Sequence, residues 1–208
     1  MALLFTRMFK ETRLLNDCTI AIIAGGKSKR FGSPKYRAKI GNLRLIDMAL
    51  SVARQLSPNV MIISGLEAIK QEFDLPVYSD EFPDCGPLAG IHSALLHAST
   101  EWVAVLPVDM PLLKADFYIR LQEQRKANMP VVAKTDKGLE PMISLWPRSA
   151  IPTIERALQN RQFKIHFVLN ELSAVHVAFP PKDRIHFFNA NFESDLNLIQ
   201  ALVSEKNS

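Results

Sequence analysis

Long hydrophobic runs and cysteines are scarce in this 208-residue chain, and each shortage excludes a class of protein. No apolar run approaches the roughly 18 residues that a membrane-spanning helix needs. The N-terminal MALLF is too short for the core of a secretory signal and charges soon follow it, so a soluble, cytoplasmic protein is expected. The two cysteines, Cys18 and Cys85, have no CxxC or metal-binding spacing and are expected to be small buried thiols.

The sequence also lacks the signatures of covalent hydrolases and of histidine metal sites. It has no GxSxG elbow to present a nucleophilic serine, and its histidines show no metal-binding spacing. Those histidines are His92, His97, His166, His176 and His186. His92 and His97 fall in an apolar helical pattern, so they are expected to be packing or surface residues.

The composition is that of a globular protein, with 48% hydrophobic and 22% charged residues, but the net charge of +4 is unevenly placed. Residues 1–50 contain ten Lys/Arg and three Asp/Glu, a surplus of +7, so the other 158 residues total −3. Six of the positive charges fall within residues 27–39, which hold no acid. This concentration predicts an anionic partner, with a merely solvated basic face as the alternative. Because only Phe31 and Tyr36 interleave as aromatics, a small polyphosphate is expected rather than a nucleic acid.

Short apolar runs alternate with helical patterns, which indicates a three-layer α/β fold with a mostly parallel sheet of about seven strands flanked by helices. The predicted strands are residues 19–24, 59–64, 76–79, 101–107, 130–134, 142–146 and 174–179. Apolar residues at three- and four-residue spacing predict helices at residues 45–57, 88–99, 115–128 and 192–206. We interpret residues 1–17 as a peripheral N-terminal extension and residues 18–208 as a single domain.

The first predicted strand runs into the segment AIIAGGKSKRFGSPK, which contains the Gly-Lys-Ser that ends a Walker A loop. A Walker A loop needs its first glycine where Ala21 stands within the strand, so a P-loop NTPase is disfavoured, and the GxGxxG pattern is not met either. Gly25 and Gly26 would turn the chain sharply and present backbone N–H groups to an anion. Lys35, at the far end of the loop, would reach a phosphate as a point charge.

Ligands of an open parallel sheet bind outside the carboxyl ends of its strands, so the residues that follow each strand are candidates. Asp109 follows the fourth predicted strand, where its carboxylate could hold Mg²⁺ beside phosphates, although an Asp ahead of a helix is commonly an N-cap. Asp80 could accept hydrogen bonds from a base edge or a ribose, or cap a turn. Gly86 and Gly90 belong to a turn whose backbone amides are expected to face the same edge.

Several of these segments resemble the MobA-like nucleotidyltransferases. IIAGGKSKRFGSPK resembles that family's LAGGxSxRMGxDK signature, CGPLAGI its GPLAGI turn, and PVDMP the segment of its metal-binding aspartate. NRQFKIHFVLNEL is similar to the G-x-R-x-V-x-x-F-L segment of molybdenum cofactor guanylyltransferases. NAN, which contains Asn189 and Asn191, is similar to their N-x-N ahead of the last helix, and from the residues alone Asn191 is expected to be the N-cap of that helix. The matches keep the family order over residues 19–203 and are closer to the guanylyltransferases than to the cytidylyltransferase relatives.

The resemblance implies a Rossmann-like fold of the nucleotide-diphospho-sugar transferase type. The implied reaction transfers GMP from GTP to the phosphate of molybdopterin, forming the guanine dinucleotide cofactor and releasing pyrophosphate. Mg²⁺ is the implied metal ion, with Mn²⁺ as an alternative, and Lys35, Asp109 and Arg30 are the implied catalytic residues, with Asp109 as the metal ligand. The implied binding residues are Ile23, Ala24, Gly25, Gly26, Lys35, Asp80, Gly86, Gly90, Asn189 and Asn191. Cofactor-inserting or recipient proteins are the expected transient partners, and no membrane partner is expected.

Three departures from the family pattern leave alternatives open. Pro34 stands where the family usually has Asp, Ser64 where an Asn often helps to hold the nucleotide, and NFESD replaces the usual N-T-P-E-D. One alternative is therefore a related nucleotidyltransferase that uses CTP or a sugar-phosphate acceptor. Another is a non-catalytic GTP-binding adaptor that kept the loop but lost the acceptor site.

Overall fold

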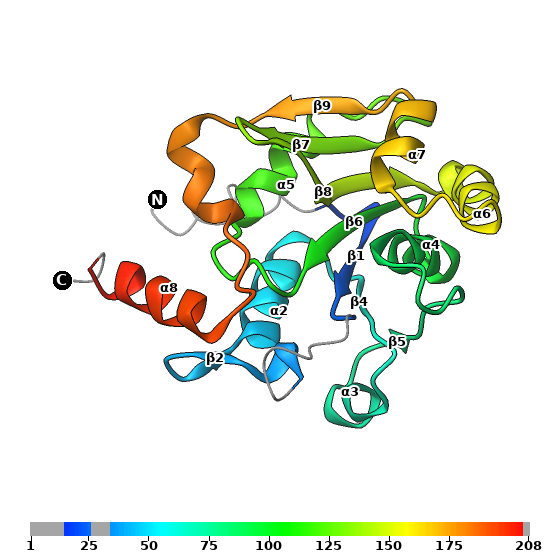
Figure 1. Ribbon diagram of the computed structural model, residues 1–208. Coiled ribbons are helices and arrows are strands. Elements are labelled where there is room, and N and C mark those ends of the chain that lie inside the picture. Colours follow the sequence, from blue (N-terminus) through cyan, green and yellow to red (C-terminus); the bar gives the residue numbers. More distant parts are fainter. Residues whose placement is uncertain (1–14, 26–33, 206–208) are drawn as a thin grey trace, which may run out of the picture.

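The computed structural model describes residues 15–25 and 34–205, which form a helix-flanked central sheet (Figure 1). The seven strands lie in the order β5-β4-β1-β6-β8-β7-β9, and β8 alone among them runs antiparallel to the rest. Their bounds are β1 (Cys18–Ile23), β4 (Val60–Ile63), β5 (Val77–Tyr78), β6 (Trp102–Pro107), β7 (Val131–Thr135), β8 (Gly138–Pro147) and β9 (Val175–Ala178). Each of the seven predicted strands is thus present, and the expected mostly parallel α/β architecture is confirmed.

Helices cover both faces of the sheet, which makes the molecule three layers deep (Figure 1). One face packs against α2 (Leu45–Leu56) and α5 (Ala115–Gln122), and α8 (Glu193–Glu205) joins the same hydrophobic core through Leu196 and Ile199. The other face packs against α4 (Pro87–His97), α6 (Ile151–Gln159) and α7 (Ile165–Glu171). The short α3 (Glu67–Glu72) lies in the connection between β4 and β5.

Alternation along the central strands explains the two cores. In β1, Ile20 and Ile22 face the α2 side while Ala21 faces the α4 side, and none of the three is exposed to solvent. Each fully buried Ile or Leu side chain contributes about 1.5–3 kcal/mol relative to an exposed one. Because both faces of β1 are covered, its sequence is apolar throughout except for the buried Thr19.

Several short elements escape the sequence prediction. Helix α5 ends at Gln122, six residues before the predicted end, and Asn128 adopts a left-handed backbone with a φ of 62°. The helices α3, α6 and α7 and the two-residue strands β2 (Lys39–Ile40) and β3 (Leu43–Arg44) were not predicted. The strands β2 and β3 and the helices α3 and α7 are too short for hydrophobic periodicity to mark them, whereas α6, with nine residues, has an amphipathic pattern that was missed.

The two cysteines are free thiols, but only one is fully buried. Burial raises the pKa of Cys18 to about 12, so this thiol stays protonated and unreactive. Cys85 is half-buried, so the expectation of burial was wrong there. It lies in a surface turn, where neighbouring elements cover only one side.

Among the described helices, none combines the length and apolar character required to cross a bilayer. Of the predicted N-terminal extension, only residues 15–17 are described. Leu15 is buried, and its N–H donates to the Leu56 carbonyl at 2.7 Å. The boundary at residue 17 stays a prediction.

Candidate active site

The carboxyl ends of β1 and β6 meet at the point where the strand order reverses. The two strands pair in register from Cys18 with Trp102 to Ile23 with Pro107. The chain leaves β1 through α2 on one face of the sheet and enters β6 through α4 on the other. Ligands of open α/β sheets bind in the crevice outside such a switch point, so this edge is the place to look for a site.

Three predicted site residues, from three distant parts of the chain, converge at this edge. The Lys35 ammonium lies 2.9 Å from Asp109 Oδ2 and 2.9 Å from Asn191 Oδ1. The side chains of Lys35 and Asp109 are 19% and 28% exposed, so the pair lies near the surface but is largely covered. Two oxygen ligands therefore converge on one cation, and the cation can be reached from solvent.

The local geometry keeps Asp109 in the loop after β6 and away from any helix N-terminus. Helix α5 begins at Ala115 and Lys114 occupies its N-cap position, so the N-cap alternative for Asp109 is wrong. Backbone hydrogen bonds tie this loop to β1 and to the segment ahead of α8. Val108 N–H donates to the Ile23 carbonyl at 3.2 Å, and the Asp109 carbonyl accepts from Ala190 N–H at 2.8 Å.

Asn191 is not the N-cap of the last helix, which corrects the sequence prediction. Helix α8 begins at Glu193, so the N-cap position belongs to Phe192. The Asp195 carboxylate, in the first turn, accepts the N–H groups of both Asn191 and Phe192 at 2.8 Å. With Phe192 at the N-cap position, Asp195 is the N3 residue whose carboxylate accepts the N-cap N–H, as in a capping box, and the Asn191 side chain contacts Lys35 instead.

An aromatic cluster supports the segment that carries the two asparagines. The preceding 3₁₀ helix η3 (Pro181–Phe187) ends at Phe187, whose ring stacks on Phe117 of α5 with centroids 5.2 Å apart. Phe179 meets both rings edge-on. Asn189, two residues beyond Phe187, is half-buried beside the residue that bonds Asp109, so the structure places it in the same segment as Asn191.

Lys35 is the first residue of the 3₁₀ helix η1 (Lys35–Arg37), and the buried side chain of its second residue, Tyr36, holds this helix in place. Tyr36 is 1% exposed, and its hydroxyl donates to Glu72 Oε2 at 3.0 Å. Arg37 donates to the same oxygen through Nη2 at 3.0 Å, and Arg44 Nη1 donates to the other carboxylate oxygen. Glu72, at the end of α3, therefore fixes the helix that presents Lys35.

Because Glu72 is ionised in these contacts, the free energy of unfolding should fall at acidic pH. Burial opposes ionisation of Glu72, but hydrogen bonds from Arg37 and Tyr36 and the two arginine charges outweigh it and lower the Glu72 pKa. Because the Glu72 pKa is lower in the folded state, its ionised carboxylate stabilises the fold at pH values above its unfolded pKa of about 4.3. This stabilisation is lost as the pH falls through the folded-state pKa. We expect Glu72→Gln to cost about 1 kcal/mol in urea unfolding at pH 7, and much less below about pH 4. A loss that is equal at both pH values would contradict this role for the charge.

The nucleotide-binding residues predicted after β1 lie beside the end of β4. Ala24 N–H donates to the Ile63 carbonyl at 2.9 Å, and the buried Ser64 hydroxyl donates to the Ala24 carbonyl at 3.4 Å. Gly25 follows and is exposed, and among the described residues none lies within 4 Å of a Cβ added there. The Ser64 hydroxyl holds the carbonyl of the residue before it.

Asp80 and Gly90 meet against Ile23. A Cβ added at Gly90 would lie 3.4 Å from Ile23 Cγ2 and 3.6 Å from Asp80 Oδ1, which places α4 beside both residues. Burial raises the pKa of the Asp80 carboxyl, and no described residue forms a hydrogen bond with it. A half-buried acceptor at the nucleotide side of the edge suits a base or ribose donor.

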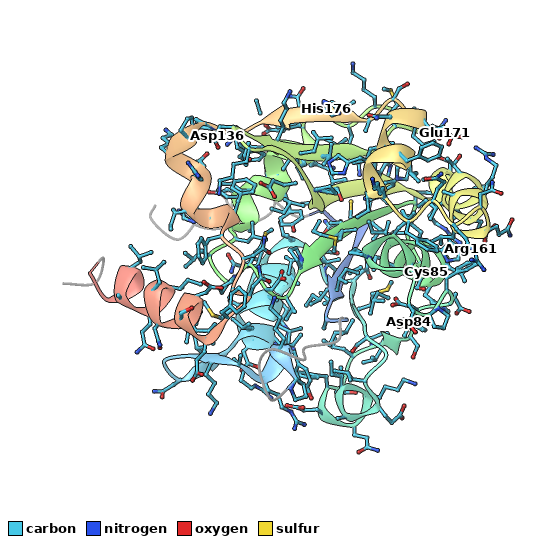
Figure 2. All side chains as sticks on the ribbon, viewed as in Figure 1. Asp84, Cys85, Asp136, Arg161, Glu171 and His176 are labelled. Atoms are coloured by element: carbon cyan, nitrogen blue, oxygen red, sulfur yellow. The ribbon has the colours of Figure 1, made fainter. Side chains whose placement is uncertain are left out.

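The turn before α4 is held in an unusual backbone conformation. Gly86, at the N-cap of α4, has a φ of 74°, which an L side chain rarely adopts. Asp84, with a φ of 59°, and Cys85 precede it (Figure 2). Glu81 N–H ties the start of this loop to Ser93 Oγ at 2.9 Å. The loop thus runs along α4, as expected of a fixed turn.

Two predicted residues lie outside the described part of the chain. Gly26 and Arg30 belong to the loop 26–33, so their roles stay predictions. Within the described residues no group of three or more His, Cys, Asp or Glu could hold a metal ion.

The structure also places two carboxylates that the sequence analysis did not single out. Glu72 lies in a polar stretch, and its partners are distant in sequence, so no local pattern marks it. Glu140 lies on β8 toward the carboxyl end of β6 and accepts from Thr135 Oγ1 at 3.0 Å. Burial raises its pKa, against the opposing effects of Thr135 and Lys137. A carboxylate within an otherwise apolar strand is the signal that marks Glu140.

Comparison with known proteins agrees with this geometry. Residues 20–175 match the family model described as the MobA-like NTP transferase domain. A "Probable molybdenum cofactor guanylyltransferase" from Carboxydothermus hydrogenoformans is 33% identical over 73% of this chain and 76% of its own length. The "Molybdenum cofactor guanylyltransferase" of Vibrio cholerae is 30% identical over 90% and 93%, respectively.

A solved structure shares the architecture. The structure of molybdopterin-guanine dinucleotide biosynthesis protein A from Archaeoglobus fulgidus has a TM-score of 0.76 at 24% identity, covering 90% of this chain and 99% of that one. That likeness concerns the fold, whereas the family match and the sequence identities concern descent. The chain therefore belongs to the MobA-like nucleotidyltransferases.

Proposed function

We propose that the protein transfers GMP from GTP to the phosphate of molybdopterin and releases pyrophosphate. The observation that carries the proposal is the convergence of Lys35, Asp109 and Asn191 at the β1–β6 switch point. The names of the guanylyltransferase relatives supply the nucleotide and the acceptor. The choice of GTP and molybdopterin rests on these names, because the charges at this edge of the sheet would suit any polyphosphate donor and any anionic acceptor.

GTP would lie over the ends of β1 and β4. The backbone of the exposed Gly25, with Ile23 and Ala24, would contact the nucleotide, and Asp80 would accept hydrogen bonds from the nucleoside. Gly86 and Gly90 would keep the N-terminal end of α4 close to it. The triphosphate would then extend toward Lys35.

The donor set fits Mg²⁺, with Mn²⁺ as an alternative. Mg²⁺ prefers oxygen ligands and is commonly bound through one or two carboxylates together with substrate phosphates and water. Asp109 Oδ2 and Asn191 Oδ1 already converge within 2.9 Å of a cationic nitrogen, so Asp109 would be the metal ligand and Asn191 its neighbour. When bound, the metal ion would neutralise the phosphates and stabilise the charge that develops on departing pyrophosphate.

The reaction needs alignment more than proton transfer. A phosphate monoester is largely dianionic at pH 7, because its second pKa is about 6, so the acceptor needs no general base. One acceptor oxygen forms a bond to the α-phosphorus of GTP. The bond from that phosphorus to the bridging oxygen breaks, and pyrophosphate leaves with its electrons. Lys35, with Arg30 in the predicted basic loop, would hold two polyanions close enough to react.

A nucleotide comparison tests the base assignment. A ligand that binds only the native state raises its stability, by about 2.7 kcal/mol at one hundred times the dissociation constant. We therefore expect GTP with Mg²⁺ to raise the melting temperature more than CTP, UTP or ATP at equal concentration. Preference for CTP would favour the related nucleotidyltransferase. Stabilisation by GTP without pyrophosphate release for any pterin acceptor would favour the adaptor.

A further inference from the structure

The carboxylate of Glu72 joins three segments of the chain. Its Oε2 accepts from the Tyr36 hydroxyl and from Arg37 Nη2, both at 3.0 Å, and both donors belong to η1. Its other oxygen accepts from Arg44, which precedes α2 and pairs with Asp47 of that helix at 2.7 Å. Because partly exposed ion pairs contribute little to stability, the clearest consequence of these contacts is a fixed position of η1 relative to α2 and α3.

Helix α3, which ends at Glu72, is itself tied to the nucleotide side of the edge. Leu66, at the N-cap position of α3, donates its N–H to Ser64 Oγ at 3.2 Å, and that hydroxyl donates to the Ala24 carbonyl at 3.4 Å. Ile69, within α3, is fully buried in the hydrophobic core that α2 also joins. The six residues of α3 therefore connect the backbone that would contact the nucleotide with the carboxylate that holds η1.

We propose that Glu72 is a positioning residue that acts on the reaction through Lys35. This inference rests on the proposed function and adds to it the means by which the phosphate-binding ammonium is placed. Lysine has a flexible four-carbon stem, so its ammonium is placed accurately only if its backbone is held. Tyr36, the next residue, supplies that hold through its buried ring and its hydrogen bond to Glu72. Since a misplacement of about 1 Å can cost about 100-fold in rate, loosening η1 should slow the reaction without removing any group that contacts substrate.

A double-mutant cycle tests whether Glu72 acts through Lys35. Glu72→Gln keeps the shape of the side chain and removes its charge. We expect it to lower kcat/KM for GTP about tenfold in the wild-type background, within the range that misplacement can cause. In the Lys35→Ala background the same substitution should change kcat/KM less than about twofold, because the ammonium that Glu72 places is already absent. A merely structural role would lower activity equally in both backgrounds.

A second variant and a matched control complete the cycle. Tyr36→Phe keeps the buried ring and removes the hydroxyl, so it should show the same dependence on Lys35, and it decides the question if Glu72→Gln does not fold. Glu67→Gln is the control, since Glu67 lies on the same helix and pairs with Lys70 at 3.3 Å but is 74% exposed. Unchanged kcat/KM in Glu72→Gln, or an equal loss in Glu67→Gln, would overturn the positioning role.

Nucleotide binding keeps this inference distinguishable from the proposed function. The same cycle is measured without acceptor, as the dissociation constant of whichever of GTP, CTP, UTP and ATP, with Mg²⁺, stabilises the wild-type protein most. If the wild type transfers no GMP, the proposed function fails and this binding cycle still decides the role of Glu72. Binding that Glu72→Gln weakens only where Lys35 is present supports the inference. Binding that is weakened equally in both backgrounds, or in neither, overturns it.

Discussion

Replacing Asp109 by Asn is expected to lower kcat about 100- to 1,000-fold while GTP binding persists. Asn has nearly the same shape but carries no charge, so it removes the anionic oxygen that Mg²⁺ prefers. It also removes the ionic partner of Lys35, whose ammonium lies 2.9 Å from Asp109 Oδ2. The loop itself should stay in place, because its ties to Ile23 and Ala190 are made by backbone atoms.

Pyrophosphate release with GTP, Mg²⁺ and molybdopterin measures the effect, and thermal stabilisation by GTP tests whether the nucleotide still binds. Asp74→Asn is the matched control, because Asp74 is an exposed carboxylate ahead of β5, at the opposite edge of the sheet. Full pyrophosphate release by Asp109→Asn would show that this carboxylate is not the metal ligand.

Most of the sheet strands and the main helices could be predicted from sequence because they are long enough to show a hydrophobic period, and the two-residue β5 was predicted from the short β-prone segment that contains it. Apart from Thr19, the residues of β1 are apolar on both faces, and the buried positions of α2 recur at three- and four-residue spacing. The hairpin of β2 and β3 offers no such pattern, since each of its strands has two residues. Its place follows from tertiary contacts, among them Gly41 N–H donating to Gln200 Oε1 of α8 at 3.2 Å.

The candidate site could be predicted as a set of residues but not as a set of contacts. Topology alone brings Lys35 and Asp109 to one edge, since each follows a parallel strand. The contact between Lys35 and Asn191 spans 156 positions and depends on how the C-terminal segment packs. The N-cap expectation for Asn191 failed because α8 begins two residues further on, at Glu193, and the Asn191 side chain contacts Lys35 instead.

Replacing Lys35 by Ala is expected to lower kcat/KM about 100-fold, which corresponds to about 2.7 kcal/mol of lost transition-state stabilisation. The side chain is the one described cation that contacts both Asp109 and Asn191, so it lies where phosphates of GTP and acceptor would meet. Charge-assisted contacts to phosphate are about twice as strong as neutral ones. The substitution should weaken GTP binding as well as turnover, since the triphosphate is present both in the GTP complex and in the transition state.

Stability distinguishes a role in catalysis from a role in folding. A partly exposed ion pair usually contributes less than about 1 kcal/mol, and Tyr36 rather than Lys35 anchors the helix η1, so Lys35→Ala should unfold at nearly the wild-type urea concentration. Lys39→Ala, four residues further on and exposed on β2, removes an equal charge from the same basic region. If the two variants lost equal activity, the general positive field of the region would explain the effect. A loss confined to Lys35→Ala would assign it to the ammonium beside Asp109.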